Sequence, residues 1–218
     1  MLKLFSITYE DGQQSPFTEY RNNTTDKAWR FEYNPMIEIV ENHLIEVKDN
    51  EFVGIFSHKF NDKTGLSKDD TLQILSETKN DFVNFSPQFT YPIAKKYYNF
   101  MDWSAQGHGE ALRDLIKACC EHIGIKYKND LTDVIYANQF AAHKQVYVAY
   151  INEVIKPCLE LLEGKLWHLA NCPANYTAGL ERKLLKQKTG LDFYNYIPFV
   201  LERMTMQWNT TRTEFGHH

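Results

Sequence analysis

The chain has 218 residues, of which 43% are hydrophobic and 24% charged, as in an ordinary globular protein long enough to bury a core. A net charge of −4 and the lack of a polybasic stretch argue against nucleic acid as a partner. No apolar run approaches the roughly 20 residues that span a bilayer, and residues 1–12 become acidic too soon for a secretory signal, so we expect a cytoplasmic protein with no transmembrane segment.

The first ninety residues alternate between strand and helix patterns. Apolar and β-branched runs bounded by turn residues indicate strands, whereas apolar residues at spacings of three and four indicate helices. The predicted order is a strand at 2–9, a helix at 35–46, a strand at 50–57, a helix at 66–79 and a strand at 81–87. Pro35 suits the first position of its helix, and Ser67 suits an N-cap. This alternation predicts an α/β sheet with helical connections.

The second half of the chain is mainly helical in pattern. Helices are expected at 109–123, 144–162, 180–188 and from Pro198 to 208, and a strand is expected within 133–142. Pro157 lies inside the second of these helices and should kink or divide it. Because the chain shows no internal repeat and no linker, we expect one domain over residues 1–218.

Strong catalytic signatures are missing from the sequence. It has no G-x-G-x-x-G, no P-loop, no H-E-x-x-H and no G-x-S-x-G. Its four cysteines form no C-x-x-C pair and are interpreted as reduced thiols in the core. The function therefore has to be sought in weaker, scattered features.

The stretch "DWSAQGHGEAL" sets Trp103, Gln106 and His108 beside Gly107 and Gly109, just before a predicted helix. Glycines allow a ligand to approach the main chain, and the free N–H groups of a helix start can bind it. A tryptophan face suits a sugar ring, while amide and imidazole groups bond hydroxyls. The alternative is a capped helix start with a packed tryptophan.

Two further candidates lie next to predicted strands. His58 and Lys59 follow the strand 50–57, and ligands of open α/β sheets gather at such carboxyl ends. Lys59 could pair with a phosphate, or it could belong to a solvated turn. Asp81 precedes the last predicted strand and could hold a divalent ion that bridges a diphosphate, or it could be a turn aspartate.

Glu202 and Arg203 interrupt the apolar pattern of the last helix, "YIPFVLERMTMQW". An arginine there can clamp a phosphate through two hydrogen bonds, and a glutamate can act as a base or bond a hydroxyl. The alternative is a structural ion pair or a solvated face of the helix.

Three segments taken in order resemble small bacterial glycosyltransferase-like proteins of polysaccharide gene clusters: "WSAQGHGEALRDLIKAC", "IYANQFAAHKQVYVAYINEVIKPCLELLE" and "YIPFVLERMTMQW". The resemblance covers residues 50–208. It implies a GT-A-like mixed sheet and a sugar donor activated by a nucleotide diphosphate. Because the chain has no Asp-x-Asp motif, Asp81 alone is the candidate ligand for Mn²⁺ or Mg²⁺. The residues that match are Lys59, Trp103, Gln106, His108, Asn138, Glu202 and Arg203.

The leading hypothesis is a glycosyltransferase that acts on a nucleotide sugar and a glycan or other hydroxyl acceptor. Glu202 and His108 are its catalytic candidates, and the substrate-binding candidates are Lys59, Trp103, Gln106, Asn138 and Arg203. A second hypothesis is a non-catalytic glycan- or nucleotide-binding protein on the same scaffold. A third is a metal-dependent hydrolase that uses His58, His108 and His143. The sequence leaves the sugar and the oligomeric state open.

Overall fold

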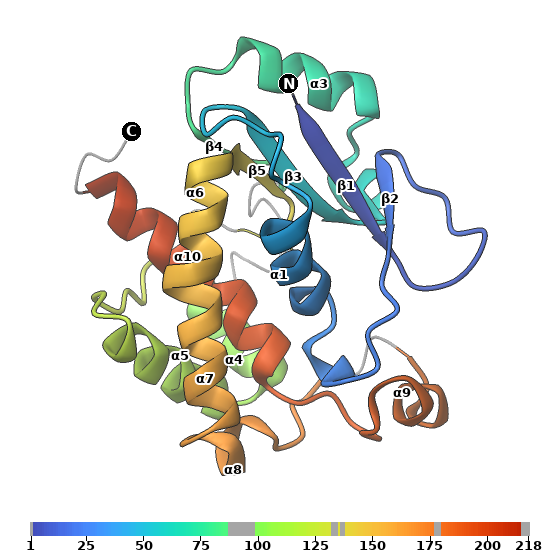
Figure 1. Cartoon of the computed structure of the whole chain (residues 1–218). Helices are drawn as coiled ribbons and strands as arrows, with labels where there is room; N and C mark the ends of the chain where they lie inside the picture. The colour runs from blue at the N-terminus through green and yellow to red at the C-terminus, as the bar shows by residue number, and fades with distance from the viewer. Residues whose placement is uncertain (1, 87–98, 132–134, 136–137, 177–179, 215–218) are drawn as a thin grey trace.

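Five strands form a mixed sheet in the order β2-β1-β3-β5-β4 (Figure 1). The computed structural model describes residues 2–86, 99–131, 135, 138–176 and 180–214. The strands are β1 (Lys3–Thr8), β2 (Thr18–Arg21), β3 (Phe52–Ser57), β4 (Phe82–Asn84) and β5 (Phe140–His143). The α/β class and the mixed sheet predicted from the sequence are confirmed.

The directions of the strands create one edge at which several of them end. β1 pairs in parallel with β2 and with β3, whereas β5 runs antiparallel to both β3 and β4. The strands β1, β2, β3 and β4 therefore all end at the same edge, where β5 begins. We call this the carboxyl edge. In α/β sheets it is the edge at which ligands usually bind.

Helices cover both faces of the sheet (Figure 1). The helical segments are η1 (Ala28–Arg30), α1 (Tyr33–Asn42), α2 (Phe60–Thr64), α3 (Lys68–Glu77), α4 (Phe100–His108), α5 (Ala111–His122), α6 (Lys144–Ala149), η3 (Tyr150–Ile155), α7 (Lys156–Glu163), α8 (Trp167–Ala170), α9 (Arg182–Thr189) and α10 (Ile197–Glu214). Side chains alternate along β1, so Phe5 and Ile7 pack in the larger core with α1, α5 and α10, whereas Leu4 joins α2 and α3.

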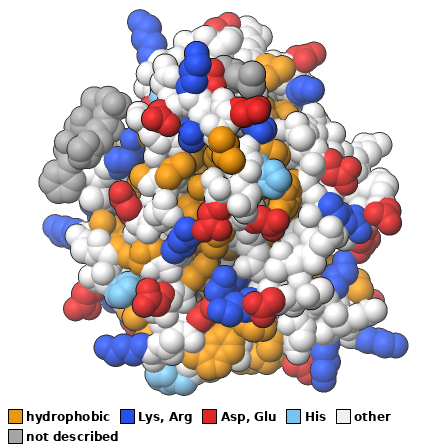
Figure 2. Space-filling model, viewed as in Figure 1, with side chains coloured by type: hydrophobic (Ala, Val, Ile, Leu, Met, Phe, Trp, Pro, Cys, Tyr) orange, Lys and Arg blue, Asp and Glu red, His pale blue; other side chains and the backbone are white. Residues whose placement is uncertain are grey.

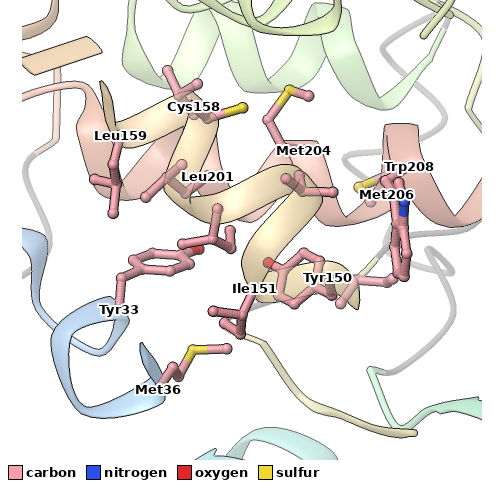
Figure 3. Close-up of a cluster of buried hydrophobic side chains, with 14 of the residues drawn as sticks. Tyr33, Met36, Tyr150, Ile151, Cys158, Leu159, Leu201, Met204, Met206 and Trp208 are labelled. Atoms are coloured by element: carbon pink, nitrogen blue, oxygen red, sulfur yellow. The ribbon is translucent and has the colours of Figure 1, made fainter. Parts of the chain in front are cut away.

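The larger core is built around the long helical run α6–η3–α7. Its η3 part is a π-helix, and Pro157 follows immediately in the first turn of α7. Proline cannot donate a backbone hydrogen bond, and the wider π-turn accommodates the missing bond. The chain therefore stays helical where the sequence predicted a kink or division. Tyr150 packs on α10, and its hydroxyl lies 2.6 Å from Thr205 Oγ1 (Figure 3).

Most predicted elements are confirmed, including the Ser67 N-cap, which forms a capping box with Asp70. Strand β2 was missed because its sequence, TEYR, is polar and lies at the edge of the sheet. Strand β5, at 140–143, overlaps the end of the strand predicted within 133–142. Most of the earlier residues of that range lie outside the described residues.

One expectation about the opening stretch is wrong. Residues 100–108 are not a loop at a helix entrance but the helix α4, capped by Asn99, whose side chain accepts a hydrogen bond from the Asp102 N–H. Gly109 ends α4 with φ 106° and ψ 151°, a conformation that is nearly confined to glycine. The chain then turns directly into α5.

Among the described residues, no helix combines the length and apolarity needed to cross a bilayer. On the face shown in Figure 2, acidic and basic side chains are interspersed, with hydrophobic side chains visible between them. That face carries no extended patch of purely positive or purely negative charge.

The Gly109→Ala substitution tests the tight junction between α4 and α5. A Cβ atom at Gly109 would lie 2.3 Å from Tyr196 Oη, in addition to the strained φ. We expect a loss of about 2–4 kcal/mol in the free energy of unfolding, measured by urea denaturation.

Two further variants separate the clash from the backbone strain. Gly124→Ala, at a positive φ of 74° with nothing within 4 Å, carries backbone strain without a clash and should cost only about 1 kcal/mol. In a Tyr196→Phe background the added Cβ would meet the ring carbon Cζ at 3.5 Å, an ordinary contact, and the Gly109→Ala loss should shrink. An unchanged loss would show that Tyr196 is not the cause.

Candidate functional site

Loops at the carboxyl edge bring together residues from four parts of the chain. Tyr9 follows β1 and His58 follows β3, and their rings lie 6.1 Å apart. Asn138 precedes β5. Burial raises the pKa of Tyr9, and the nearby Glu32 carboxylate raises it further. Glu32, at the start of α1, therefore faces the same edge.

Asn138 is held in an uncommon conformation. It is buried and has φ 55°, the left-handed region that asparagine tolerates better than most residues. Its Nδ2 donates to Glu32 Oε1 at 3.5 Å, and its Oδ1 accepts from Tyr33 Oη at 3.4 Å. A predicted substrate-binding residue thus positions a carboxylate that the sequence analysis did not identify.

The segment before Glu32 is fixed to the helical layer by charge. Lys27 Nζ donates to Glu163 Oε2 at 2.7 Å, and the Arg30 guanidinium pairs with both oxygens of the same carboxylate. Burial opposes ionisation of Glu163, but these two cations hold its pKa below its ordinary value. This contact between η1 and α7 fixes the place of Glu32.

Arg203 is buried at 2% side-chain exposure and meets polar groups on two helices. On its own helix, α10, it pairs with Glu202 Oε2 at 3.1 Å. On α4, it donates to Ser104 Oγ at 3.3 Å and lies 3.4 Å from His108 Nε2. Its guanidinium also lies 5.4 Å from the centre of the Phe100 ring. These contacts join α4 to α10.

His108 is a neutral imidazole in this setting. Burial lowers its pKa to about 3, and the Arg203 charge contributes to the shift. Because a guanidinium only donates, Nε2 accepts and the ring proton belongs on Nδ1. Among the described residues, Nδ1 is buried without a hydrogen-bond partner. His108 is thus suited to orienting Arg203 and poorly suited to proton transfer near neutral pH.

The two carboxylates Glu32 and Glu202 come from opposite ends of the chain, and their segments approach each other where η1 contacts α10. Burial raises the pKa of Glu32 above its ordinary value, and Glu202 raises it further, whereas Lys63 and the Asn138 amide lower it. The side chain of Glu202 is 17% exposed. Such a pair can accept a proton from a hydroxyl and hold a neighbouring hydroxyl at the same time.

Two basic side chains, Lys59 and Lys63, follow β3 at the carboxyl edge. Lys59 is the N-cap of α2, and Lys63 is four residues further on, so the two share one side of this short helix. Both are exposed, and both charges lower the pKa of His58, although burial is the larger cause. They supply positive charge at the carboxyl edge.

The structure brings together only part of the predicted site. His108, Arg203, Glu202 and Asn138 converge as described, and Lys59 lies nearby. Gln106 is exposed and lies about 200° around α4 from His108, so it points away. Trp103 is partly buried, with its ring centre 5.6 Å from that of Phe100. Trp103 and Gln106 therefore do not form a corner with His108.

Asp81, the predicted metal ligand, lies at the opposite edge of the sheet. It precedes β4, its carbonyl accepts from the His143 N–H at the end of β5, and its carboxylate makes two hydrogen bonds of 2.8 Å to Arg212. That guanidinium holds the pKa of Asp81 below its ordinary value, although burial opposes the shift. Asp81 thus has a structural partner and is remote from Glu32 and Glu202.

The donor set also fits a divalent ion poorly. No group of three His, Cys, Asp or Glu side chains within the described part of the chain is arranged to hold a metal. His143 lies at the edge opposite His58, so the histidines proposed for a hydrolase do not meet. Neither Asp81 nor these histidines form a site for Mn²⁺ or Mg²⁺ in the part of the chain that the structure describes.

Glu32, Lys63 and the aromatic residue Tyr176 were missed by the sequence analysis. Burial raises the pKa of Tyr176, and its ring lies 5.6 Å from that of His108 and 5.0 Å from that of Phe199 on α10, the helix that bears Glu202. The one available signal for Lys63 was its spacing of four from Lys59. Glu32 sits in a polar, turn-prone stretch and carries no such signal.

The His108→Gln substitution tests the neutral imidazole. The pKa falls from 6.5 to about 3 on folding, so between these values the unfolded chain binds more protons. Stability due to neutral His108 is complete above about pH 6.5 and decreases as the pH falls. Between pH 7 and pH 5 the wild type should lose about 2 kcal/mol more than the variant in urea denaturation. Equal losses of unfolding free energy in the wild type and the variant would contradict the neutral imidazole. The control is His168→Gln, at an exposed position.

Comparison of the chain with protein-family models, with curated proteins and with solved structures found no match.

Proposed function

We propose that the protein is a glycosyltransferase that moves a sugar from a nucleotide-sugar donor to a hydroxyl of a glycan or another acceptor. The observation that carries the proposal is that Glu32, hydrogen-bonded to Asn138 at the carboxyl edge, follows closely after η1, which contacts the helix α10 that bears the Glu202–Arg203 pair. This edge is where such sheets usually bind substrates. The resemblance over residues 50–208 and the mixed sheet support a GT-A-like arrangement.

The carboxylate pair fits the requirements of transfer to a hydroxyl. The acceptor oxygen attacks the anomeric carbon, the bond from that carbon to the diphosphate breaks, and the nucleoside diphosphate leaves with the electron pair. The acceptor proton must go to a base. A base works best when its pKa lies near the working pH, and burial beside Glu202 moves Glu32 in that direction.

The two carboxylates then have different tasks. Arg203 keeps Glu202, the base proposed from the sequence, paired at 3.1 Å. Burial raises the pKa of Glu32, which suits this carboxylate to accept a proton. We assign proton removal to Glu32 and binding of the acceptor hydroxyl to Glu202. His108 is a positioning residue that acts through Arg203.

The leaving diphosphate requires positive charge, which the exposed ammonium group of Lys63 can supply near Glu32, together with Lys59 one turn earlier on α2. Lysine acts here as a point charge. Arg203 is buried and bonded on several sides, so it serves to place Glu202 and not to clamp a phosphate.

A non-catalytic glycan-binding protein is the second candidate. The observation that favours it is the pairing of Glu202 with Arg203, which also suits a rigid binding site that only accepts hydrogen bonds from hydroxyls. Titration calorimetry with a panel of nucleotide sugars, with and without manganese, separates the two candidates. Donor binding with slow release of nucleoside diphosphate supports the enzyme, whereas glycan binding without any donor binding supports the second candidate.

The Glu32→Gln and Glu202→Gln variants test the carboxylate pair. Each should lower the rate of nucleoside diphosphate release at least about 100-fold. Glu32→Gln should also raise the midpoint of thermal unfolding at pH 7, because a raised pKa means that the fold disfavours the charged form. Glu153→Gln, at an exposed position on η3, is the matched control. Full activity in both site variants would contradict the proposal.

The Lys63→Ala variant tests the diphosphate assignment. Losing one charge near the leaving group should raise KM for the donor roughly tenfold, equivalent to about 1.4 kcal/mol. The effect should weaken at high salt. Lys68→Ala, exposed at the start of α3, should leave KM unchanged. An equal change in both variants would point to a general loss of charge.

A further inference from the structure

Beside the carboxylate pair lies a cluster of five rings drawn from four separate segments. We call it the aromatic platform: Phe31, His108, Tyr176, Tyr194 and Phe199. The Phe31 and Tyr194 rings are stacked at 5.4 Å with 17° between their planes. Tyr176 lies 5.0 Å from both Tyr194 and Phe199. His108 stacks on Phe199 at 4.1 Å.

The aromatic platform is continuous with the carboxylate site. Phe31 directly precedes Glu32, and Phe199 lies three and four residues before Glu202 and Arg203 on α10, hence on the same side of that helix. Segment 28–30 also contacts α9 and α10. Phe199 and His108 are each only 8% exposed, so the surface open to a ligand is the rim formed by Tyr176, Tyr194 and Phe31, directly next to Glu32.

Two features of the platform are unusual for plain core packing. Tyr176 is 39% exposed although it contacts three other rings. Phe31 has φ 50°, which is strained for a bulky side chain, and Lys27 just before η1 has φ 49°. Strain of this kind is concentrated at functional sites. In this backbone conformation the Phe31 ring stacks on the Tyr194 ring.

We propose that the aromatic platform binds a pyranose ring of the acceptor, which makes the acceptor a glycan. This inference rests on the proposed function, since it names the acceptor class of the same site. Aromatic rings attract the C–H faces of sugars and leave the hydroxyl groups free at the rim. The hydroxyls then donate to Glu32 and Glu202.

Charge argues for a neutral sugar over other flat ligands. A phosphate-bearing or acidic ligand placed on the platform would be repelled by two neighbouring carboxylates. A nucleobase could stack equally well, but it offers only one or two N–H donors beside several acceptor nitrogens and carbonyls, whereas a pyranose carries hydroxyl donors on most of its ring carbons. The carboxylates thus select for a ligand rich in hydroxyl groups.

Saturation-transfer NMR on the full chain tests this without any donor. The probes are the methyl glycosides of glucose, galactose, mannose and N-acetylglucosamine, with uridine and adenosine as separate arms. At least one glycoside should receive saturation on its ring C–H protons. Tyr176→Ala should reduce that signal at least fivefold, whereas Tyr176→Phe should retain it because only the ring is needed.

Tyr127→Ala is the matched control, since Tyr127 is a partly buried tyrosine outside the aromatic platform. The inference is overturned if no glycoside responds, if only the nucleosides respond, or if Tyr176→Ala leaves the signal unchanged. Its failure is separable from that of the transferase. If the donor is turned over but no glycoside receives saturation, only the inference about the aromatic platform is contradicted. If a glycoside binds through Tyr176 but no donor binds, only the proposed transferase activity is contradicted.

Discussion

A buried guanidinium constrains the helical half of this protein. Arg203 has almost no contact with solvent, and removing such a charge from water is costly unless it is paired and fully hydrogen-bonded. Its partners are Glu202 on its own helix and Ser104 and His108 on α4. The position of α4 against α10 follows from that requirement. So does the orientation of Glu202, which cannot turn away from Arg203 without leaving the buried charge unpaired.

A second feature works against stability. Glu32 is placed where burial and Glu202 both disfavour its charge, and Asn138, in a left-handed conformation, holds it there. The ion pairs of Lys27 and Arg30 with Glu163 offset this by fixing the preceding segment to α7. Folded proteins tolerate such local conflict chiefly at sites with a function. This is the physical reason to regard the carboxylate pair as more than packing.

Periodicity predicted most of the fold because burial imposes it locally. The strands β1 and β3 and the helices α1, α3, α5 and α10 were expected from their apolar spacing. Periodicity failed where burial did not decide the structure. Strand β2 is a polar edge strand, and residues 100–108 look like a loop because two glycines end the stretch, although Asn99 caps a helix there. Pro157 was expected to kink or divide its helix, but the run α6–η3–α7 stays helical through a π-turn.

The sequence by itself determined the α/β class, the order of most elements and the residues that interrupt apolar patterns, since Glu202 and Arg203 stand out within the apolar pattern of the last helix. It could not determine which of them meet. Gln106 and His108 are neighbours in sequence but point in opposite directions, because a helix turns about 100° per residue. Glu32 and Tyr176 join Glu202 only because the carboxyl edge, η1 and the start of α10 come together in space. Contacts between distant segments depend on how the layers pack, and a single sequence carries no local record of that packing.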